Sequence, residues 1–316
     1  MANDRRPDWV PREEPVPCRA MATTYPRPSD VEILGLQFDD ELGRCHFELV
    51  PGLARHDGAL YGGAAIAVSV AAMEAATNRP CLWLTTQYVA TAGQTDIIEC
   101  TTDVLARGRN ITQSQVTGRH GDRVLFVSIG STATPREGGL EGQYVEGPLV
   151  SPPEESGSMV LGAPGAPSTS SVQGITRQVE YRAAELLGDP ATAPQLAMWA
   201  RLKVGHPVTP ASISFVADMV PGAIARANGL IGGGASLDNS LRFGRIPDGE
   251  EWVLLELRAQ MAVGAHAHGS VHVWSRHGAL LAVGGQSANM SHMFSAEQVE
   301  AMMAASADAG PAGQRT

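Results

Sequence analysis

The sequence predicts an α+β protein built from two similar repeats, each with a curved antiparallel sheet wrapped around one long helix. The motif Arg-His-Gly at 119–121 recurs at 276–278, about half the chain later. Each copy lies between an alternating segment and an apolar run, which is typical of a β-hairpin. Each half also has one helix candidate that is apolar on nearly all sides, and such a helix must be buried. A sheet that curves around the helix would bury it.

In the first repeat the helix candidate spans 59–77. It contains no Pro, and its first acidic residue is Glu74, near its end. Apolar and alternating runs on either side of it predict strands, and we expect the four after the helix to pair in hairpin succession. The expected strands are 31–38, 46–50, 82–90, 97–105, 111–118 and 122–133.

In the second repeat the helix is expected to begin at Thr209-Pro210, because Thr is a good N-cap and Pro suits the first helical position. The pattern extends to Ala227, and Pro221 should kink or end the helix. Three glycines at 232–234 are interpreted as the bend into the next strand, since no phosphate-loop context surrounds them. The expected strands are 177–183, 195–203, 235–243, 251–260, 266–275 and 279–288.

Composition divides the chain further. An extended, Pro-rich arm is expected before the first repeat, a Gly/Pro/Ser-rich linker between the repeats, and a short helix with a loose end after the second. The expected segments are the arm 1–30, the first repeat 31–135, the linker 136–172, the second repeat 173–293 and the tail 294–316.

The charge balance argues against several function classes. Lys+Arg 23 against Asp+Glu 33 gives a net charge of −10, without a basic run, so we expect neither nucleic-acid nor membrane binding. The four cysteines form no CxxC motif and suggest neither a disulfide framework nor a zinc ribbon. The N-terminus has no apolar segment of the secretory kind, so a cytoplasmic protein is expected. Charged residues are only 18% of the chain, which favours burial between subunits and a homodimer or larger assembly.

Five short motifs give the chain a resemblance to a known family. They are Tyr61-Gly62-Gly63, Ala217-Asp218, Ser236-Leu237-Asp238-Asn239-Ser240, Trp252 and Gln286. Together with the two repeats, they resemble the type II acyl-CoA thioesterases, whose fold is a double hot-dog. The resemblance covers roughly 31–135 and 173–291. It implies an enzyme that hydrolyses a fatty or related acyl-CoA to free acid and CoA, without a cofactor or a metal.

The resemblance places the family's catalytic Asp, Thr and Gln on Asp218, Ser236 and Gln286. Ser keeps the hydroxyl of Thr, whereas Asn239 replaces a His of the family. The residue types suit the reaction, because a carboxylate can take a proton from water, and a hydroxyl and a carboxamide can orient that water. Without the resemblance, Asp218 would be interpreted as a solvent-facing or capping residue and Ser236 as an ordinary turn residue, whereas for Gln286 an edge-facing polar residue and a functional one would be equally favoured. The first repeat has no equivalent acid, so we expect one active site per chain, in the second repeat.

Three other groups of residues are candidates for a functional role. His266, His268 and His272 share one strand face, but no acid or Cys completes a metal site beside them, and a solvated face is preferred. His56-Asp57 could form an acid–base pair, yet a turn before Gly58 is preferred. Arg242, Arg245 and Arg258 are candidates for the CoA phosphates only because Arg suits phosphate. Two alternative functions stay open: a hot-dog hydratase or dehydratase acting on enoyl-CoA or hydroxyacyl-CoA, and a non-catalytic acyl-CoA-binding protein.

Overall fold

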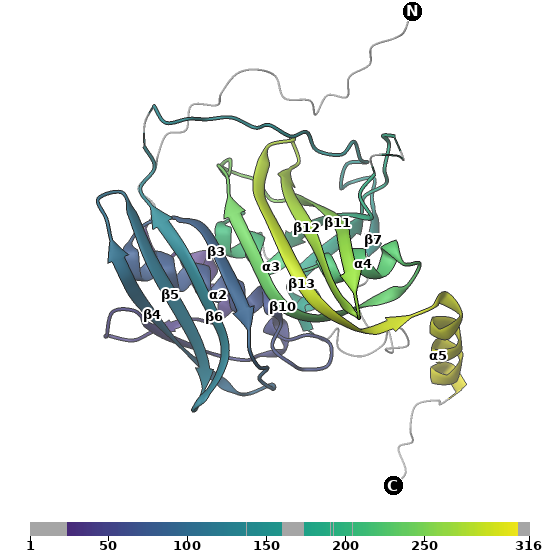
Figure 1. Cartoon of the computed structure of the whole chain (residues 1–316), viewed down its shortest axis with the longest axis horizontal. Coiled ribbons are helices and arrows are strands. Elements are labelled where there is room, and N and C mark those ends of the chain that lie inside the picture. The colour runs from purple at the N-terminus through teal and green to yellow at the C-terminus, as the bar shows by residue number, and fades with distance from the viewer. Residues whose placement is uncertain are drawn as a thin grey trace, which may run out of the picture.

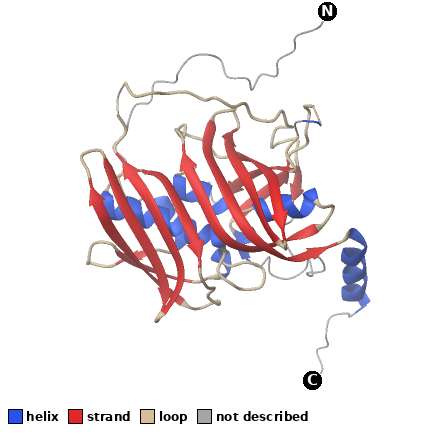
Figure 2. Ribbon diagram, viewed as in Figure 1, coloured by secondary structure: helices blue, strands red, loops and turns tan. Residues whose placement is uncertain are grey.

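The computed structural model describes residues 24–136, 138–159, 174–189, 191, 193–203 and 205–308. Most of the expected arm, part of the linker and the end of the tail therefore lie outside the described residues. Within these ranges the strands form one antiparallel sheet of 13 strands, in the order β1-β2-β4-β5-β6-β3-β10-β13-β12-β11-β9-β8-β7. The helices α2 (Gly62–Thr77), α3 (Pro210–Val216) and α4 (Val220–Ala227) lie together on one side of this sheet (Figure 2). The expected α+β architecture, in which the antiparallel sheet of each repeat packs against its helix, is confirmed.

Each repeat contributes one half of the sheet (Figure 1). In the first the strands are β1 (Gln37–Phe38), β2 (Arg44–Glu48), β3 (Cys81–Tyr88), β4 (Ile97–Arg107), β5 (Ile111–His120) and β6 (Arg123–Ala133). In the second they are β8 (Val179–Ala183), β9 (Leu196–Leu202), β10 (Ile231–Phe243), β11 (Val253–Val263), β12 (His266–Ser275) and β13 (Leu280–Phe294).

The order of the strands corrects one expectation. β3 does not pair with β4, the next strand along the chain, but with β6 on one side and β10 on the other. The hairpin succession is therefore wrong at this step in each half, since β10 likewise pairs with β13 rather than β11. The β3–β10 ladder, in which Thr85 lies opposite Ser240, joins the two repeats into one sheet.

The central helix of the first repeat, α2 (Gly62–Thr77), is buried almost along its whole length. Many of its side chains are the small methyl groups of Ala, so the sheet and the helix α3 can both approach it closely. It ends at Asn78, whose φ of 52° is the left-handed conformation that Asn tolerates at a helix terminus. Glu74 is buried on this helix and accepts a hydrogen bond from the backbone N–H of Cys81 at 2.9 Å.

The helix of the second repeat is broken into two. α3 (Pro210–Val216) begins at Thr209, which forms a capping box with Ser212. α4 (Val220–Ala227) begins after a break at 217–219, with Pro221 in its first turn. Pro cannot donate the backbone hydrogen bond that a continuous helix would need, so the predicted effect of Pro221 is confirmed. The break is important for the site, because Asp218 lies within it.

The strand expected at 31–38 is wrong for most of its length, because a helix, α1 (Pro28–Leu34), occupies it. Pro28 fits the start of a helix, and Gly35 ends it at φ 61°. The helix also overlaps the end of the expected arm. Asp30 is buried and accepts a hydrogen bond from the Thr209 hydroxyl at 2.7 Å, so α1 is fastened to the start of α3 in the other repeat.

Part of the expected linker packs on the second repeat. Residues 157–159 form a short strand, β7 (Gly157–Met159), that pairs with β8. Before it, the chain covers a tryptophan cluster made of Trp199, Trp252 and Trp274 together with Val150. The indole N–H of Trp199 donates to the backbone oxygen of Ser151 at 2.8 Å. This segment is therefore held against the sheet by specific contacts.

Three smaller features complete the described chain. The glycines at 232–234 lie inside β10, so their interpretation as a bend is wrong; irregular pairing follows them, between Gly233 and Ala235. Two short 3-10 helices lie at Pro51–Leu53 and Gly174–Arg177. The short helix expected in the tail is confirmed as α5 (Ala296–Asp308). Among the helices of the described ranges, none has the length and hydropathy that a membrane span requires.

Candidate active site

Asp218 lies in the break between α3 and α4, where its carboxylate is almost completely buried, at 8% exposure. Two sheet residues point at it from neighbouring strands, Ser236 on β10 and Gln286 on β13. The Ser236 hydroxyl donates to Asp218 Oδ1 at 3.4 Å, and the Gln286 amide donates to the same oxygen. The three residues named from the sequence therefore form one cluster.

The members of this cluster also hold one another. The Gln286 amide Nε2 donates to the Ser236 hydroxyl at 2.7 Å. Its other end, Oε1, accepts the backbone N–H of Val220 at 3.3 Å, which anchors the fully buried Gln286 to the start of α4. A carboxylate, a hydroxyl and an amide that share hydrogen bonds in this way can hold a small polar molecule with a defined orientation.

The environment makes the carboxyl of Asp218 a suitable base near neutral pH. Burial raises the pKa of Asp218 from its ordinary value to about 6, and hydrogen bonds from Asn239, Gly63, Gln286 and Ser236 partly offset this effect. A base is most effective when its pKa lies near the working pH, because it is then ionised and still able to accept a proton.

The first repeat forms part of the same site. The backbone N–H of Gly63, in the first turn of α2, donates a hydrogen bond to the Asp218 carboxyl. A Cβ on Gly62 would lie 2.5 Å from Asp218 Oδ2, so only Gly permits this approach. Tyr88 on β3 donates its hydroxyl to the backbone oxygen of Gly62 at 3.0 Å, and Tyr61 donates to the backbone oxygen of Asp218 at 3.4 Å. The site is thus built where the two repeats meet.

Sequence reasoning did not assign a role to several of these neighbours. The Tyr-Gly-Gly motif stands out in the sequence only through its resemblance to the family, and no pattern singles out Tyr88. Asn239 was considered only as a change in the pocket wall, yet its amide Nδ2 donates to Asp218 Oδ1 at 3.3 Å. Asn239 lies three residues after Ser236 on the same strand, and regular alternation would place the two side chains on opposite faces of the sheet. The irregular pairing between Ser236 and Asp238 changes this, and a sequence pattern does not reveal such an irregularity.

The other candidates have different surroundings. His268 hydrogen bonds Ser287 at 3.0 Å, and His272 lies 3.3 Å from the Glu256 carboxylate. In the part of the chain that the structure describes, no three His, Cys, Asp or Glu side chains are grouped so as to hold a metal ion. The Asp57 carboxylate accepts the backbone N–H of Ala59 at 3.1 Å and hydrogen bonds Arg55, which is the turn arrangement preferred from the sequence.

The three arginines named for CoA phosphates are each engaged elsewhere. Arg245 pairs with Glu141 at 2.5 Å, and Arg258 pairs with Glu256 at 2.7 Å. The guanidinium of Arg242 lies 5.9 Å from the ring centre of Trp83. None of these contacts points to the cluster around Asp218.

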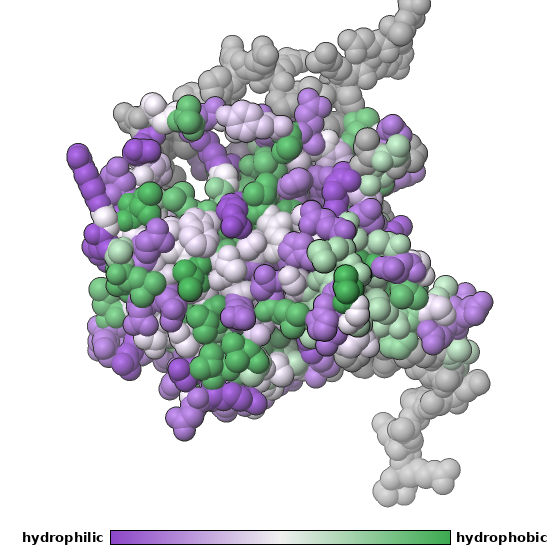
Figure 3. All heavy atoms as spheres, viewed as in Figure 1, coloured by the Kyte–Doolittle hydropathy of each residue, from purple (hydrophilic) through white to green (hydrophobic). Residues whose placement is uncertain are grey.

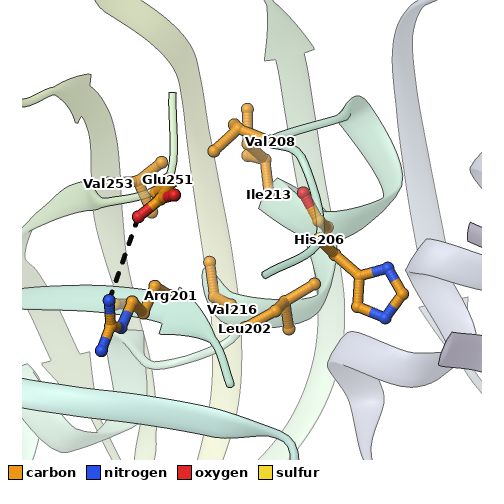
Figure 4. A pocket seen from close by; sticks show the side chains of 10 residues that line it. Arg201, Leu202, His206, Val208, Ile213, Val216, Glu251 and Val253 are labelled. Carbon is orange, nitrogen blue, oxygen red and sulfur yellow. Dashed lines mark ion pairs between the residues drawn. The ribbon is translucent and has the colours of Figure 1, made fainter. Parts of the chain in front are cut away.

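Two hollows near the helices differ in size. The pocket between β9, β11 and α3 is lined by residues that include His206, Val208 and Ile213, with the Arg201–Glu251 ion pair at its edge (Figure 4). Its volume of about 10 Å³ suits one water molecule at most, so it does not hold an acyl chain. A wider open groove of about 660 Å³ lies before the start of α2, lined by His56, Arg123 and their neighbours.

The fold and the cluster together define a class: a double hot-dog protein with a buried acid at the junction of its repeats. Comparison with family models identifies the family. Residues 51–134 match the acyl-CoA thioesterase N-terminal domain, and residues 153–290 match the acyl-CoA thioesterase C-terminal domain. The chain belongs to the acyl-CoA thioesterase family and is a thioester hydrolase, which sets aside the hydratase and the non-catalytic alternatives.

Solved structures agree on the fold. A presumed thioesterase from Novosphingobium aromaticivorans has 29% identity and a TM-score of 0.70 over 81% of this chain and 98% of its own. The TesB protein of Mycobacterium avium subspecies paratuberculosis has 20% identity and a TM-score of 0.65, over 82% of this chain and 96% of its own. Acyl-CoA thioesterase II TesB2 of Mycobacterium marinum has 18% identity and a TM-score of 0.64, over 83% and 98%. A comparison with curated proteins gives no significant match.

Proposed function

We propose that this chain hydrolyses a fatty or related acyl-CoA to the free acid and CoA, using a water molecule that Asp218 activates. The observation that carries the proposal is the convergence of Ser236 and Gln286 on one oxygen of a buried carboxylate whose pKa is raised to about 6. No cofactor enters the reaction, because the attacking group is water and the base belongs to the protein.

The proposed reaction follows from the cluster. Ser236 and Gln286 hold the water beside Asp218, and Asp218 takes one proton as the water oxygen bonds to the thioester carbon. The negative charge that develops on the carbonyl oxygen is stabilised at the start of α2, where the positive end of the helix dipole lies. When the C–S bond breaks, Asp218 returns the proton to the sulfur of CoA.

The proposal includes one site per chain. In the first repeat, the hydroxyls of Ser69, Thr86 and Ser128 are buried between α2, β3 and β6 and bond to one another at 2.7 Å. These hydroxyls include no carboxylate, so no base of the Asp218 kind is available among them. In this proposal the first repeat therefore contributes to the site of the second repeat through α2 and does not hold a second active site.

We further propose a cytoplasmic enzyme of lipid metabolism that assembles as a homodimer or larger. Apolar side chains are interspersed across the outer face of the sheet (Figure 3). Large apolar residues exposed on strands of the first repeat include Leu82, Val104, Leu105, Ile111 and Ile129. Their exposure supports an interface that includes this half of the sheet.

The proposed activity is tested by offering the purified chain a panel of acyl-CoAs of different length and branching, with a thiol-reactive dye reporting free CoA. At least one acyl-CoA should release thiol at a rate proportional to the amount of enzyme. Binding of acyl-CoA without any thiol release across the panel would contradict the proposal.

The rate should depend on pH in the direction that a raised carboxyl pKa dictates. Because Asp218 must be ionised to accept a proton and its pKa is about 6, kcat/KM should be constant above about pH 7 and fall as pH decreases through 6. Well below pH 6 the fall should approach tenfold per pH unit. Thiol release measured with a pH-independent reporter from pH 5 to 8 checks this, and an unchanged rate at pH 5 contradicts it.

A further inference from the structure

Asn239 occupies the point where the two repeats and the active site meet. Its side chain is buried, at 1% exposure. On β10 it lies opposite Gln286 of β13 on one side and opposite Thr86 of β3 on the other. It is therefore held by the continuous sheet on both sides, and its position relative to Gln286 is set by the ladder rather than by a loop.

The orientation of the Asn239 amide follows from its neighbour. Its Nδ2 donates to Asp218 Oδ1 at 3.3 Å. A carboxylate can only accept hydrogen bonds, so the NH₂ side of the amide must face Asp218. The opposite end, Oδ1, is buried and has no hydrogen-bond partner among the described residues. A buried amide oxygen without a partner is unfavourable unless something present during the reaction donates to it.

We propose that Asn239 is the fourth residue of the water site: its N–H holds Asp218 Oδ1 in place, and its free oxygen accepts the hydrogen of the attacking water that Asp218 does not take. This inference rests on the proposed function and adds to it. The water then has two acceptors, Asp218 for the proton that is transferred and Asn239 for the one that stays. Both hydrogens are directed, so the lone pair of the water oxygen points at the substrate.

The other titratable groups that face Asp218 do not change charge over the pH range in which Asp218 titrates. Among the described residues, those that interact with its charge are three tyrosines, Tyr61 at the start of α2, Tyr88 on β3 and Tyr181 on β8. Burial raises the pKa of each of these hydroxyls above its usual value, so all three stay neutral over the acid range. Changes in the titration of Asp218 can therefore be assigned to Asn239.

Two substitutions test the inference. Asn239→Ala removes a hydrogen bond that favours the ionised form of Asp218, so kcat/KM should fall by about tenfold or more and the acid limb of the pH profile should move upward. Asn239→Asp is nearly isosteric but puts a second carboxylate beside Asp218. The acid limb should then move upward by about one pH unit or more, because two carboxylates sharing a site cannot both ionise easily.

The control is Asn228→Asp, which adds the same charge at the end of α4, where the side chain of Asn228 donates to the backbone oxygen of Ile224 at 2.8 Å. This variant should keep the parental rate and the parental acid limb. A structural role alone for Asn239 would lower the rate without moving the limb. A limb at the parental pH in either Asn239 variant overturns the proposal.

A second readout separates this inference from the proposed activity. The titration of the Asp218 carboxyl can be followed by carbon-13 NMR without turnover, with its signal assigned by its loss in Asp218→Asn. The pKa of Asp218 should rise in both Asn239 variants and stay unchanged in Asn228→Asp. If the parent releases no thiol from any acyl-CoA, the proposed function fails while this titration still decides whether Asn239 holds Asp218. An unchanged Asp218 titration in the Asn239 variants contradicts the inference even in an active enzyme.

Discussion

The substitution Asp218→Asn is expected to lower kcat for acyl-CoA hydrolysis by about two to four orders of magnitude, the usual contribution of a general base. Asn has the same size and keeps one acceptor oxygen for the donors Ser236, Asn239 and Gln286, so the protein should stay folded. Only the ability to take a proton is removed. Thiol release under saturating substrate, with a thermal unfolding curve for each protein, measures both parts of the expectation.

Companion variants show whether the loss belongs to this cluster. Ser236→Ala and Gln286→Ala should each cost about one to three orders of magnitude, since each orients the water. Combined with Asp218→Asn, they should add little, because residues that act as a unit are non-additive. Asp57→Asn should leave turnover within a few fold of the parent. Loss of activity in Asp57→Asn with normal activity in Asp218→Asn would mean that the site lies in the first repeat, and it would contradict the assignment of the catalytic residues.

The second large loss of activity is expected from Gly62→Ala, a substitution that lies in the first repeat. The new Cβ would lie 2.5 Å from Asp218 Oδ2 and 3.1 Å from the Tyr88 hydroxyl, so the carboxylate must move. A displacement of about 1 Å in a catalytic group can cost about a hundredfold in rate. We therefore expect kcat/KM to fall by about that factor. Steady-state kinetics of thiol release would measure this loss.

Gly157→Ala is the matched control, because a Cβ on this glycine of β7 would meet nothing within 4 Å. It should leave both activity and stability unchanged. Thermal unfolding of Gly62→Ala should still show a cooperative transition, which would distinguish a displaced base from a misfolded chain. Full activity in a folded Gly62→Ala protein would contradict the close approach of the two repeats at the site.

The sequence predicted the repeated architecture because its signals are local. The Arg-His-Gly hairpins, the apolar run of α2 and the Thr209-Pro210 start of α3 each depend on neighbouring residues. The pairing of β3 with β6 and β10 could not be predicted in this way, because partner choice depends on the tertiary arrangement. Helix α1 was missed because its apolar residues also fit a strand, and the buried Asp30–Thr209 contact that fixes it is remote in sequence.

The candidate site, too, could be predicted from the sequence only in part. Asp218, Ser236 and Gln286 were named because they match motifs of a family, and the structure brings their side chains together. The contribution of Gly63 and Tyr88 could not be derived from the residues themselves, because it depends on how the first repeat meets the second. The same is true of Asn239, whose contact with Asp218 depends on the irregular pairing between Ser236 and Asp238.

The most direct test of the central claim follows oxygen from the solvent into the product. Enzyme in excess over acyl-CoA is mixed in water enriched in oxygen-18, and the acid from the first turnover is examined by mass spectrometry. If Asp218 activates water for direct attack on the thioester, each acid molecule should carry one solvent oxygen. First-turnover acid without solvent oxygen would mean that the Asp218 carboxylate itself attacks and donates its own oxygen, which would contradict the account.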